Sequence, residues 1–316
     1  MEHGDIRILA DKLCANVATA IVGKDEEIRL VLATMLAGGH VLLEDVPGTG
    51  KTMLAKALAK SVDCNFRRVQ FTPDLLPSEL TGINFYSPKS GEFSFREGSL
   101  FTNILLADEI NRATPRTQSG LLESMEELQV SVDGVTYPLP RPYFVIATQN
   151  PVETQGTFPL PEAQLDRFLI QLRLGYPTEE ETADVLERYV SGAPMERISP
   201  VCTGEDITAM AQLASSVYIH REVYLYIAKL AQATRSHEAI ALGASTRACL
   251  ALSRLAQSYV AMEGRGFVTP DDVKLLCPYV FGHRLIFRGS RRGLDSAGVI
   301  GEVLANVTAP VENWKA

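Results

Sequence analysis

Lys51 and Thr52 are the residues whose types and spacing most clearly indicate chemistry. A short apolar run within residues 40–45 leads into a turn rich in glycine, and residues 53–60 continue with helical periodicity. In such a strand, loop and helix, the loop amides and the positive end of the helix bind phosphate oxygens. The lysine then reaches the β- and γ-phosphates, and the threonine hydroxyl ligates Mg²⁺. The predicted nucleotide-binding residues of the loop are Pro47, Gly48, Thr49, Gly50, Lys51, Thr52 and Met53.

One position departs from the usual phosphate-loop pattern. Asp45 stands where that pattern has its first glycine. An ordinary glycine-rich turn before a helix is the alternative interpretation. The Lys51-Thr52 pair and its position between a strand and a helix favour a phosphate site.

Asp108 and Glu109 end a second apolar strand, which begins at residue 104. At the carboxyl end of a parallel strand, both acids can approach the mouth at which the phosphate loop opens. We expect Asp108 to hold the ligand shell of Mg²⁺ and Glu109 to polarise the water that attacks the γ-phosphate. Alone, the pair could simply cap the helix that begins near residue 114, but its place after the phosphate loop and at the end of a buried strand favours catalysis.

Two weaker features lie near the same chemistry. Asn150 ends a further apolar strand and could orient the attacking water, although an asparagine before a proline also occurs in ordinary turns. Val22 and Gly23 separate two helical patterns ahead of the phosphate loop. They could form one wall of an adenine pocket or a simple turn between helices.

Arg247 falls in the first turn of a predicted helix that Ser245 or Thr246 would cap. A cation is unfavourable at that end of the helix dipole. This misfit points to an anionic partner such as a phosphate, with a surface ion pair as the alternative. The basic and aromatic segment 281–288 could contact nucleic acid, but so short a run is more typical of a packed connection.

Strands and helices alternate along the first part of the chain, which predicts a mostly parallel α/β sheet. Two hairpins are expected within it, at residues 83–95 and 129–137. Asp133-Gly134 is the strongest turn signal in the sequence.

The strand patterns end near residue 175, and only helical patterns follow from residue 179. We therefore expect an α/β nucleotide-binding core over residues 1–175 and a smaller all-α lid over residues 176–316.

The composition is that of a globular protein: 46% of the 316 residues are hydrophobic. A formal charge of −8 and a pI near 5.3 disfavour a general attraction to nucleic acid or to an anionic membrane. The five cysteines form no metal-binding pattern, which predicts reduced thiols in a cytoplasmic protein. With no apolar signal region and no apolar run long enough to cross a bilayer, membrane insertion is not expected.

Several strings together resemble the MoxR family of AAA+ ATPases, and the resemblance covers essentially the whole chain. The strings are residues 43–52, 70–78, 106–109, 147–151, 165–168 and 243–247.

The resemblance implies a five-stranded sheet of order 5-1-4-3-2 with inserted hairpins facing a pore, a helical lid, bound ATP and assembly as a ring, expected to be a hexamer. By the same resemblance Asn150 matches sensor 1. Arg167 matches the arginine finger that reaches the γ-phosphate of a neighbouring subunit, with Arg112 and Arg116 as alternatives. Arg247 matches sensor 2, whose action in cis or in trans stays open.

Members of this family typically remodel or mature partner proteins, often ones with a von Willebrand factor A domain. A chaperone-like ATPase with a protein client is therefore the leading hypothesis, and a nucleic-acid motor of the MCM type or the ATPase subunit of a metal chelatase are the alternatives. The predicted hairpin tips, residues 87–90 and 133–134, carry one lysine and one acid. A DNA motor is expected to have more basic tips.

Overall fold

The computed structural model describes residues 3–46, 48–88, 91–151, 156–190, 192–288 and 296–310. Its centre is a five-stranded parallel sheet in the order β2-β5-β8-β1-β9. The strands are β1 (Val41–Glu44), β2 (Phe66–Gln70), β5 (Ile104–Asp108), β8 (Phe144–Gln149) and β9 (Ile170–Leu172). Numbered 1 to 5 along the chain, they follow the order 5-1-4-3-2, which confirms the expected α/β topology.

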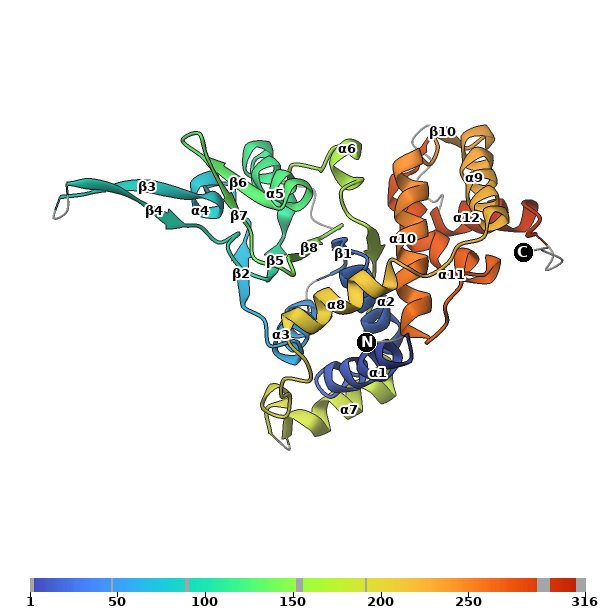
Figure 1. Ribbon diagram of the computed structural model, residues 1–316, viewed down its shortest axis with the longest axis horizontal. Helices are drawn as coiled ribbons and strands as arrows, with labels where there is room; N and C mark the ends of the chain where they lie inside the picture. The colour runs from blue at the N-terminus through green and yellow to red at the C-terminus, as the bar shows by residue number, and fades with distance from the viewer. Residues whose placement is uncertain are drawn as a thin grey trace.

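Helices cover both faces of this sheet (Figure 1). One face packs against α1 (His3–Ala18), α2 (Asp25–Leu36) and α3 (Lys51–Ser61), and the other against α4 (Pro77–Thr81) and α5 (Pro115–Glu127). Successive strand residues alternate between the two apolar clusters, with Val41 and Leu43 in the first and Leu42 in the second. Because both faces are buried, the central strands β1, β5 and β8 are mostly apolar rather than alternating, whereas the edge strand β2 carries exposed polar residues.

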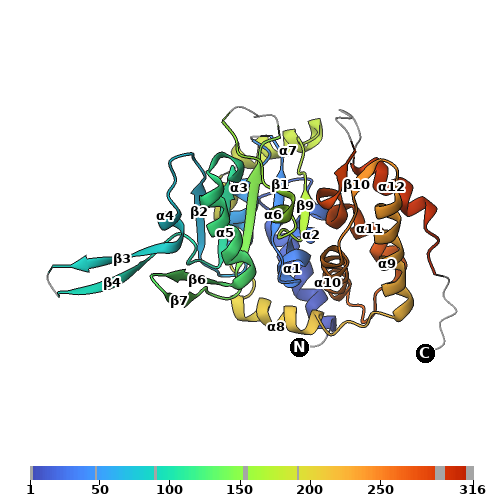
Figure 2. The same ribbon diagram turned by 90° about the horizontal axis from the view of Figure 1, so that it is seen from above.

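Both predicted hairpins are present, and they contact each other. They are β3–β4 (Gly82–Ser87, Glu92–Glu97) and β6–β7 (Gln129–Val132, Val135–Pro138). Asp133 and Gly134 have φ angles of 50° and 80°, as the tight turn requires. The rings of Phe95 and Tyr137 stack with centroids 3.9 Å apart, and Asn84 donates a hydrogen bond to Asp133 at 2.8 Å. The β3–β4 hairpin projects away from the body as a long arm (Figure 2).

The C-terminal part is mostly helical, and its last four helices lie at the end of the molecule opposite the β3–β4 arm (Figure 1). Its helices are α7 (Glu179–Val190), α8 (Gly204–Ala214), α9 (Arg221–Ser236), α10 (Thr246–Met262), α11 (Pro270–Phe281) and α12 (Ser296–Asn306). Two short strands, β10 (Ile240–Leu242) and β11 (Ile286–Phe287), also pair there. The expected helical lid is confirmed. The two short strands within it were not predicted, because strands of two or three residues are too short to show a period.

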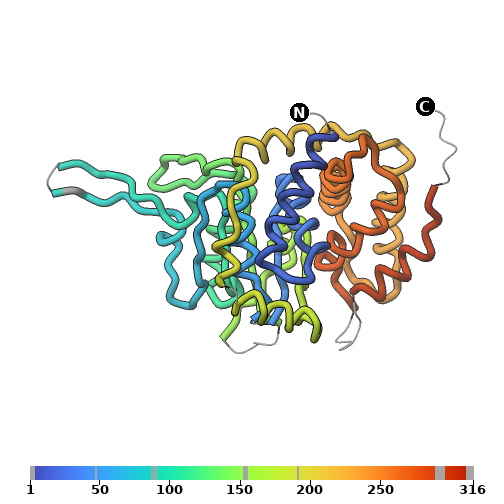
Figure 3. The backbone as a smooth tube through the Cα atoms, turned by 90° about the horizontal axis from the view of Figure 1, so that it is seen from below, coloured from blue at the N-terminus to red at the C-terminus, as the bar shows by residue number. Residues whose placement is uncertain are grey.

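The helical part is joined to the core through α1 and α2. The tube in Figure 3 shows α1 beside α10, and one apolar cluster continues from α1–α3 into the helices that follow. Arg29 on α2 pairs with Asp11 on α1 at 3.1 Å and with Glu263, just after α10, at 2.7 Å. Helix α7 returns to the core, where Arg188 donates to the carbonyl of Ala18 at 2.8 Å. The boundary at residue 175 stays a prediction.

All five cysteines are free, as predicted. Burial raises the pKa of Cys202 and of Cys277 to about 12, so both are inert thiols packed in the interior. Among the described residues, no helix is long and apolar enough to cross a membrane.

Candidate nucleotide-binding site

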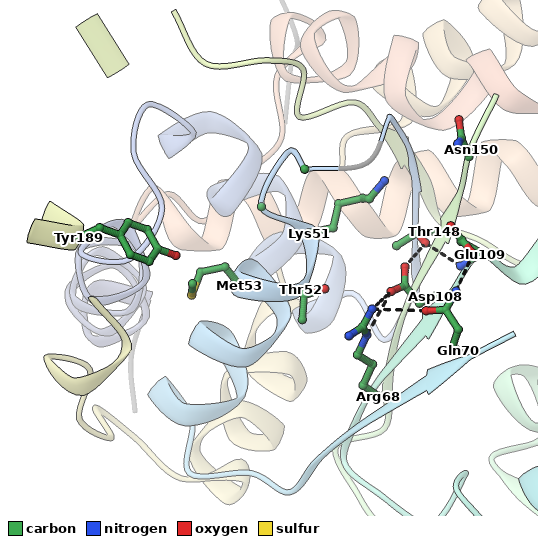
Figure 4. A pocket seen from close by; sticks show the side chains of 12 residues that line it. Lys51, Thr52, Met53, Arg68, Gln70, Asp108, Glu109, Thr148, Asn150 and Tyr189 are labelled. Atoms are coloured by element: carbon green, nitrogen blue, oxygen red, sulfur yellow. Dashed lines mark hydrogen bonds and ion pairs between the residues drawn. The ribbon is translucent and has the colours of Figure 1, made fainter. Parts of the chain in front are cut away.

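A pocket opens at the carboxyl edge of the sheet, where β1, β5 and β8 end. Its volume of about 440 Å³ lies in the range of small-molecule sites. The residues that line it are Gly48, Gly50, Lys51, Thr52, Met53, Arg68, Gln70, Asp108, Glu109, Thr148, Asn150 and Tyr189 (Figure 4). The predicted loop, acid pair and strand-end asparagine are thus brought together.

The loop before α3 has the backbone of a phosphate cradle. Gly48 and Gly50 both have φ of 88°, a left-handed conformation in which a side chain would be strained, and Gly50 is the N-cap of α3. The ammonium of Lys51 spans the loop, donating to the carbonyls of Asp45 at 2.8 Å and Val46 at 3.0 Å. Pro47 lies outside the described residues.

Asp45, the departure from the usual loop pattern, has a structural role. Its carboxylate is buried and accepts hydrogen bonds from the backbone amides of Val46 at 2.9 Å and of Leu174 and Gly175 at 2.8 Å each. A glycine could make none of these contacts. The aspartate therefore ties the phosphate loop to the chain that leaves β9, just ahead of α7.

Asp108 is held by partners on the neighbouring strands. Its Oδ1 accepts a hydrogen bond from the Thr148 hydroxyl at 2.7 Å, and the same hydroxyl accepts from the backbone amide of Glu109 at 2.8 Å. Its Oδ2 pairs with the guanidinium of Arg68 at 2.6 Å. The carboxylate at the predicted metal position therefore already carries a cationic partner.

The oxygen donors at this point fit a magnesium ion. Asp108 and the hydroxyl-bearing Thr52 line the same pocket, and Mg²⁺ prefers one or two such protein ligands together with phosphate and water oxygens. Among the described residues there is no cluster of three or more His, Cys, Asp or Glu side chains that could hold a metal ion. Thr52 and Asp108 would hold the ion, which would supply positive charge against the phosphates.

Glu109 is fixed in a strained backbone conformation, with φ 57° and ψ 50°. Its Oε2 accepts a hydrogen bond from Gln70 at 2.6 Å and lies 3.2 Å from Nε of Arg112. Both donors come from the same subunit, so Arg112, one of the alternative fingers, contacts the predicted water-activating acid. Asn150 lies at the end of the adjacent strand β8 and lines the same pocket.

The opposite end of the pocket is formed by Met53 and Tyr189, away from Asp108 and Glu109 (Figure 4). An aromatic ring and a thioether suit the flat apolar face of a base. Val22 and Gly23 are not among the lining residues. A side chain at Gly23 would collide with Glu181 of α7, because its Cβ would lie 1.8 Å from the carboxylate oxygen.

The two other predicted arginines lie elsewhere. Arg167, after α6 (Glu162–Leu165), and Arg247, in the first turn of α10, line a second cavity that also includes His40 and Glu126. Both pair with the carboxylate of Glu126. Arg116 is exposed in the first turn of α5. Among the described residues that line the nucleotide pocket, Lys51 and Arg68 are the cations.

Arg68, Gln70, Thr148 and Tyr189 were not predicted as site residues. Arg68 and Gln70 are two apart on β2, so they project from the same face of the strand. The sequence did contain a signal for these two site residues: they are polar, two apart, and near the carboxyl end of a predicted strand. Tyr189 comes from a helix some 80 residues beyond Glu109, and its pattern gave no such signal.

The ion pair of Arg68 leads to a prediction about magnesium. Arg68→Ala is expected to lower the Mg²⁺ concentration for half-maximal ATP turnover by about fivefold, because a half-exposed ion pair is worth about 1 kcal/mol. A Mg²⁺ titration at fixed ATP measures the effect. Arg67→Ala is the matched control, since Arg67 donates to the carbonyl of Gly98 and lies outside this pocket. An unchanged Mg²⁺ requirement would show that Arg68 does not compete for Asp108.

Two family models match the chain. Residues 40–170 match the ATPase family associated with various cellular activities (AAA), and residues 232–301 match the AAA lid domain. The matched segments contain the phosphate loop and the acidic pair in the first case and Arg247 in the second.

Similar proteins extend over nearly the whole chain. The uncharacterized protein YeaC of Bacillus subtilis is 46% identical over 98% of this chain and 97% of its own, and the chaperone MoxR1 of Mycobacterium tuberculosis is 38% identical over 94% and 81%. The crystal structure of a candidate ATPase from Cytophaga hutchinsonii is 36% identical, with a TM-score of 0.91, and covers 98% of this chain and 97% of its own. With the phosphate loop, acidic strand end and lid in place, the chain belongs to the MoxR family of AAA ATPases.

Proposed function

We propose that this MoxR-type ATPase works as a ring, most simply a hexamer, in which each ATP site is completed by the neighbouring subunit. The energy of hydrolysis then remodels or matures a protein client. The carrying observation is the separation of the site into two surfaces: Lys51, Asp108 and Glu109 line the nucleotide pocket, whereas Arg167 and Arg247 line another cavity. A ring contact that placed the second surface against a neighbour's pocket would complete the site in trans, for both arginines.

The positions of the residues support a role for each. The loop amides and Lys51 would hold the phosphates, and Glu109 would take a proton from the attacking water while Asn150 orients it. Gln70 and Arg112 keep the carboxylate of Glu109 in place until that water is bound. Arg167 of the neighbour would neutralise the charge that develops on the γ-phosphate.

A continuous path joins this chemistry to the hairpins. Glu109 is followed by η1 (Ile110–Arg112) and α5, and α5 leads directly into the β6–β7 hairpin. That hairpin is stacked on β3–β4 through Phe95 and Tyr137. A shift of η1 and α5 between nucleotide states would therefore move both hairpins together.

A protein client is supported by the surface of the β3–β4 arm. Phe93 and Tyr86 are 74% and 53% exposed, and Ile83 and Phe85 are also exposed. Apolar side chains gathered on a projecting arm are typical of a protein contact. The name of the relative MoxR1 describes a chaperone, which agrees with this proposal, and we favour a client with a von Willebrand factor A domain. Lys89, in the predicted tip of the first hairpin, lies outside the described residues. We also propose a cytoplasmic location, in line with five free thiols.

Turnover is expected to depend on assembly. ATP hydrolysis per subunit should rise with protein concentration, in parallel with ring formation measured by sedimentation velocity, because the pocket of an isolated subunit has no neighbour's arginine surface against it. Turnover that stays constant while the protein dissociates would contradict the shared site. Three additions then separate the hypotheses. Stimulation of turnover by a von Willebrand-type protein supports a protein client, stimulation by DNA supports the motor, and stimulation by a metal with a porphyrin supports the chelatase subunit.

A further inference from the structure

Glu126, near the end of α5, joins two arginines that come from different parts of the fold. Its Oε2 lies 3.4 Å from Nε of Arg167, which precedes β9. Its Oε1 accepts a hydrogen bond from Nη2 of Arg247, in the first turn of the lid helix α10. A single carboxylate therefore brings two guanidinium groups side by side, although they are 80 residues apart in the sequence.

The surroundings of this trio are rigid on the side of Arg167. Asp166 is held by Arg284, whose Nε donates to it at 2.5 Å and whose side chain is only 4% exposed. Arg284 also donates to the carbonyls of Asp166, Phe168 and Leu169 at 2.7–3.1 Å. The remaining oxygen of Asp166 lies 4.0 Å from Arg247. The turn that carries Arg167 is thus fixed to the segment after α11.

The end of α5 is fixed as well. His40 is buried between β1 and α5, and its Nδ1 accepts from the backbone amide of Val145 at 3.1 Å. Its Nε2 therefore carries the proton and donates to the carbonyl of Met125, also at 3.1 Å. Burial lowers the pKa of His40 to about 4, so this link stays neutral near pH 7. The carbonyl that it holds belongs to the residue next to Glu126.

The cavity beside the trio has an excess of positive charge. Its charged lining residues are Arg167, Arg247, Arg254, Arg284, Glu126 and Asp166. Four guanidinium groups against two carboxylates attract an anionic group. Arg167 and Arg247 are thus paired at an electropositive cavity, and Glu126 between them offsets the repulsion of their charges.

We propose that Glu126 is a positioning residue that holds Arg167 and Arg247 together, ready for the phosphates bound by the neighbouring subunit. The inference rests on the proposed function, in which both arginines act in trans. Ordering a long arginine side chain costs conformational entropy. By holding both side chains, Glu126 orders them in part before the ring contact forms. Arg167 and Arg247 can then approach one phosphate together.

Glu126→Gln tests the inference, because it keeps the size of the side chain and removes its charge. We expect kcat to fall by about 10- to 100-fold, the range for a misplaced catalytic group. ATP binding, measured by equilibrium fluorescence with a labelled nucleotide, and ring formation, measured by sedimentation velocity, should stay unchanged. Glu127→Gln is the matched control, because Glu127 is the next residue and its side chain is exposed. It should match the wild type in kcat, ATP binding and ring formation. Glu126→Asp should recover part of the loss.

Mixing separates a positioning role from general damage to the fold. Glu126→Gln subunits keep Glu109, and Glu109→Gln subunits keep Glu126 with both arginines, so their mixture should regain turnover that neither has alone. Wild-type or faster turnover of Glu126→Gln would overturn the inference. The inference would also be overturned if the mixture of Glu126→Gln with Glu109→Gln stayed inactive while a parallel mixture of Arg167→Ala with Glu109→Gln recovered turnover. If both mixtures stay inactive in co-assembled rings, the proposed function fails and the inference fails with it.

Discussion

Glu109→Gln is expected to lower ATP turnover by about 10²–10⁴-fold, the contribution of a positioned general base. Glutamine retains the shape and the contact with Gln70, but it cannot take a proton from water. Single-turnover hydrolysis with excess protein measures the chemical step directly.

ATP binding provides the control for this variant. Lys51 and the glycine loop are untouched, so the affinity for a labelled nucleotide should stay within about twofold of the wild type, less than 0.5 kcal/mol. Near-normal turnover would show that another group activates the water. Loss of binding together with turnover would instead show that Glu109 supports the pocket itself.

Arg167→Ala is expected to lower kcat by about 10³–10⁵-fold, the effect of removing an arginine finger. The pocket of the same subunit contains neither Arg167 nor Arg247, so nucleotide binding by dissociated subunits should be unaffected. Steady-state turnover at protein concentrations at which the ring is assembled measures the loss.

The alternative fingers are tested with the same assay. Arg116→Ala removes an exposed arginine from α5 and should have little effect. Arg112→Ala removes a partner of Glu109 within one subunit, so its defect should not be rescued by a neighbour. An inactive Arg116→Ala beside an active Arg167→Ala would reassign the finger.

The parts of the fold that could be predicted are those with local causes. The glycines of the phosphate loop and Asp133-Gly134 require left-handed backbone, and each was predicted at the correct position. The apolar strands were visible because each is buried on both faces. The strand order came from the resemblance to the family, since periodicity alone does not order a parallel sheet.

The parts that could not be predicted depend on contacts between distant residues. Asp45 replaces the first glycine of the phosphate-loop pattern, and the reason is its hydrogen bonds from the backbone amides of Leu174 and Gly175. Those residues are distant in the sequence. The misfit of Arg247 at its helix start did indicate an anionic partner, and within the subunit that partner is Glu126. Nothing in the local sequence of α5 distinguishes Glu126 from its neighbour Glu127.

The most direct test of the shared ATP site is Mg²⁺-dependent ATP turnover by an equimolar mixture of Glu109→Gln and Arg167→Ala. Each variant alone should be nearly inactive. In a mixed ring, some interfaces place an intact Glu109 against a neighbour with an intact Arg167, so turnover should recover. If the two variants co-assemble and the mixture stays inactive, Arg167 does not complete the site of a neighbouring subunit, and the proposed ring mechanism is contradicted.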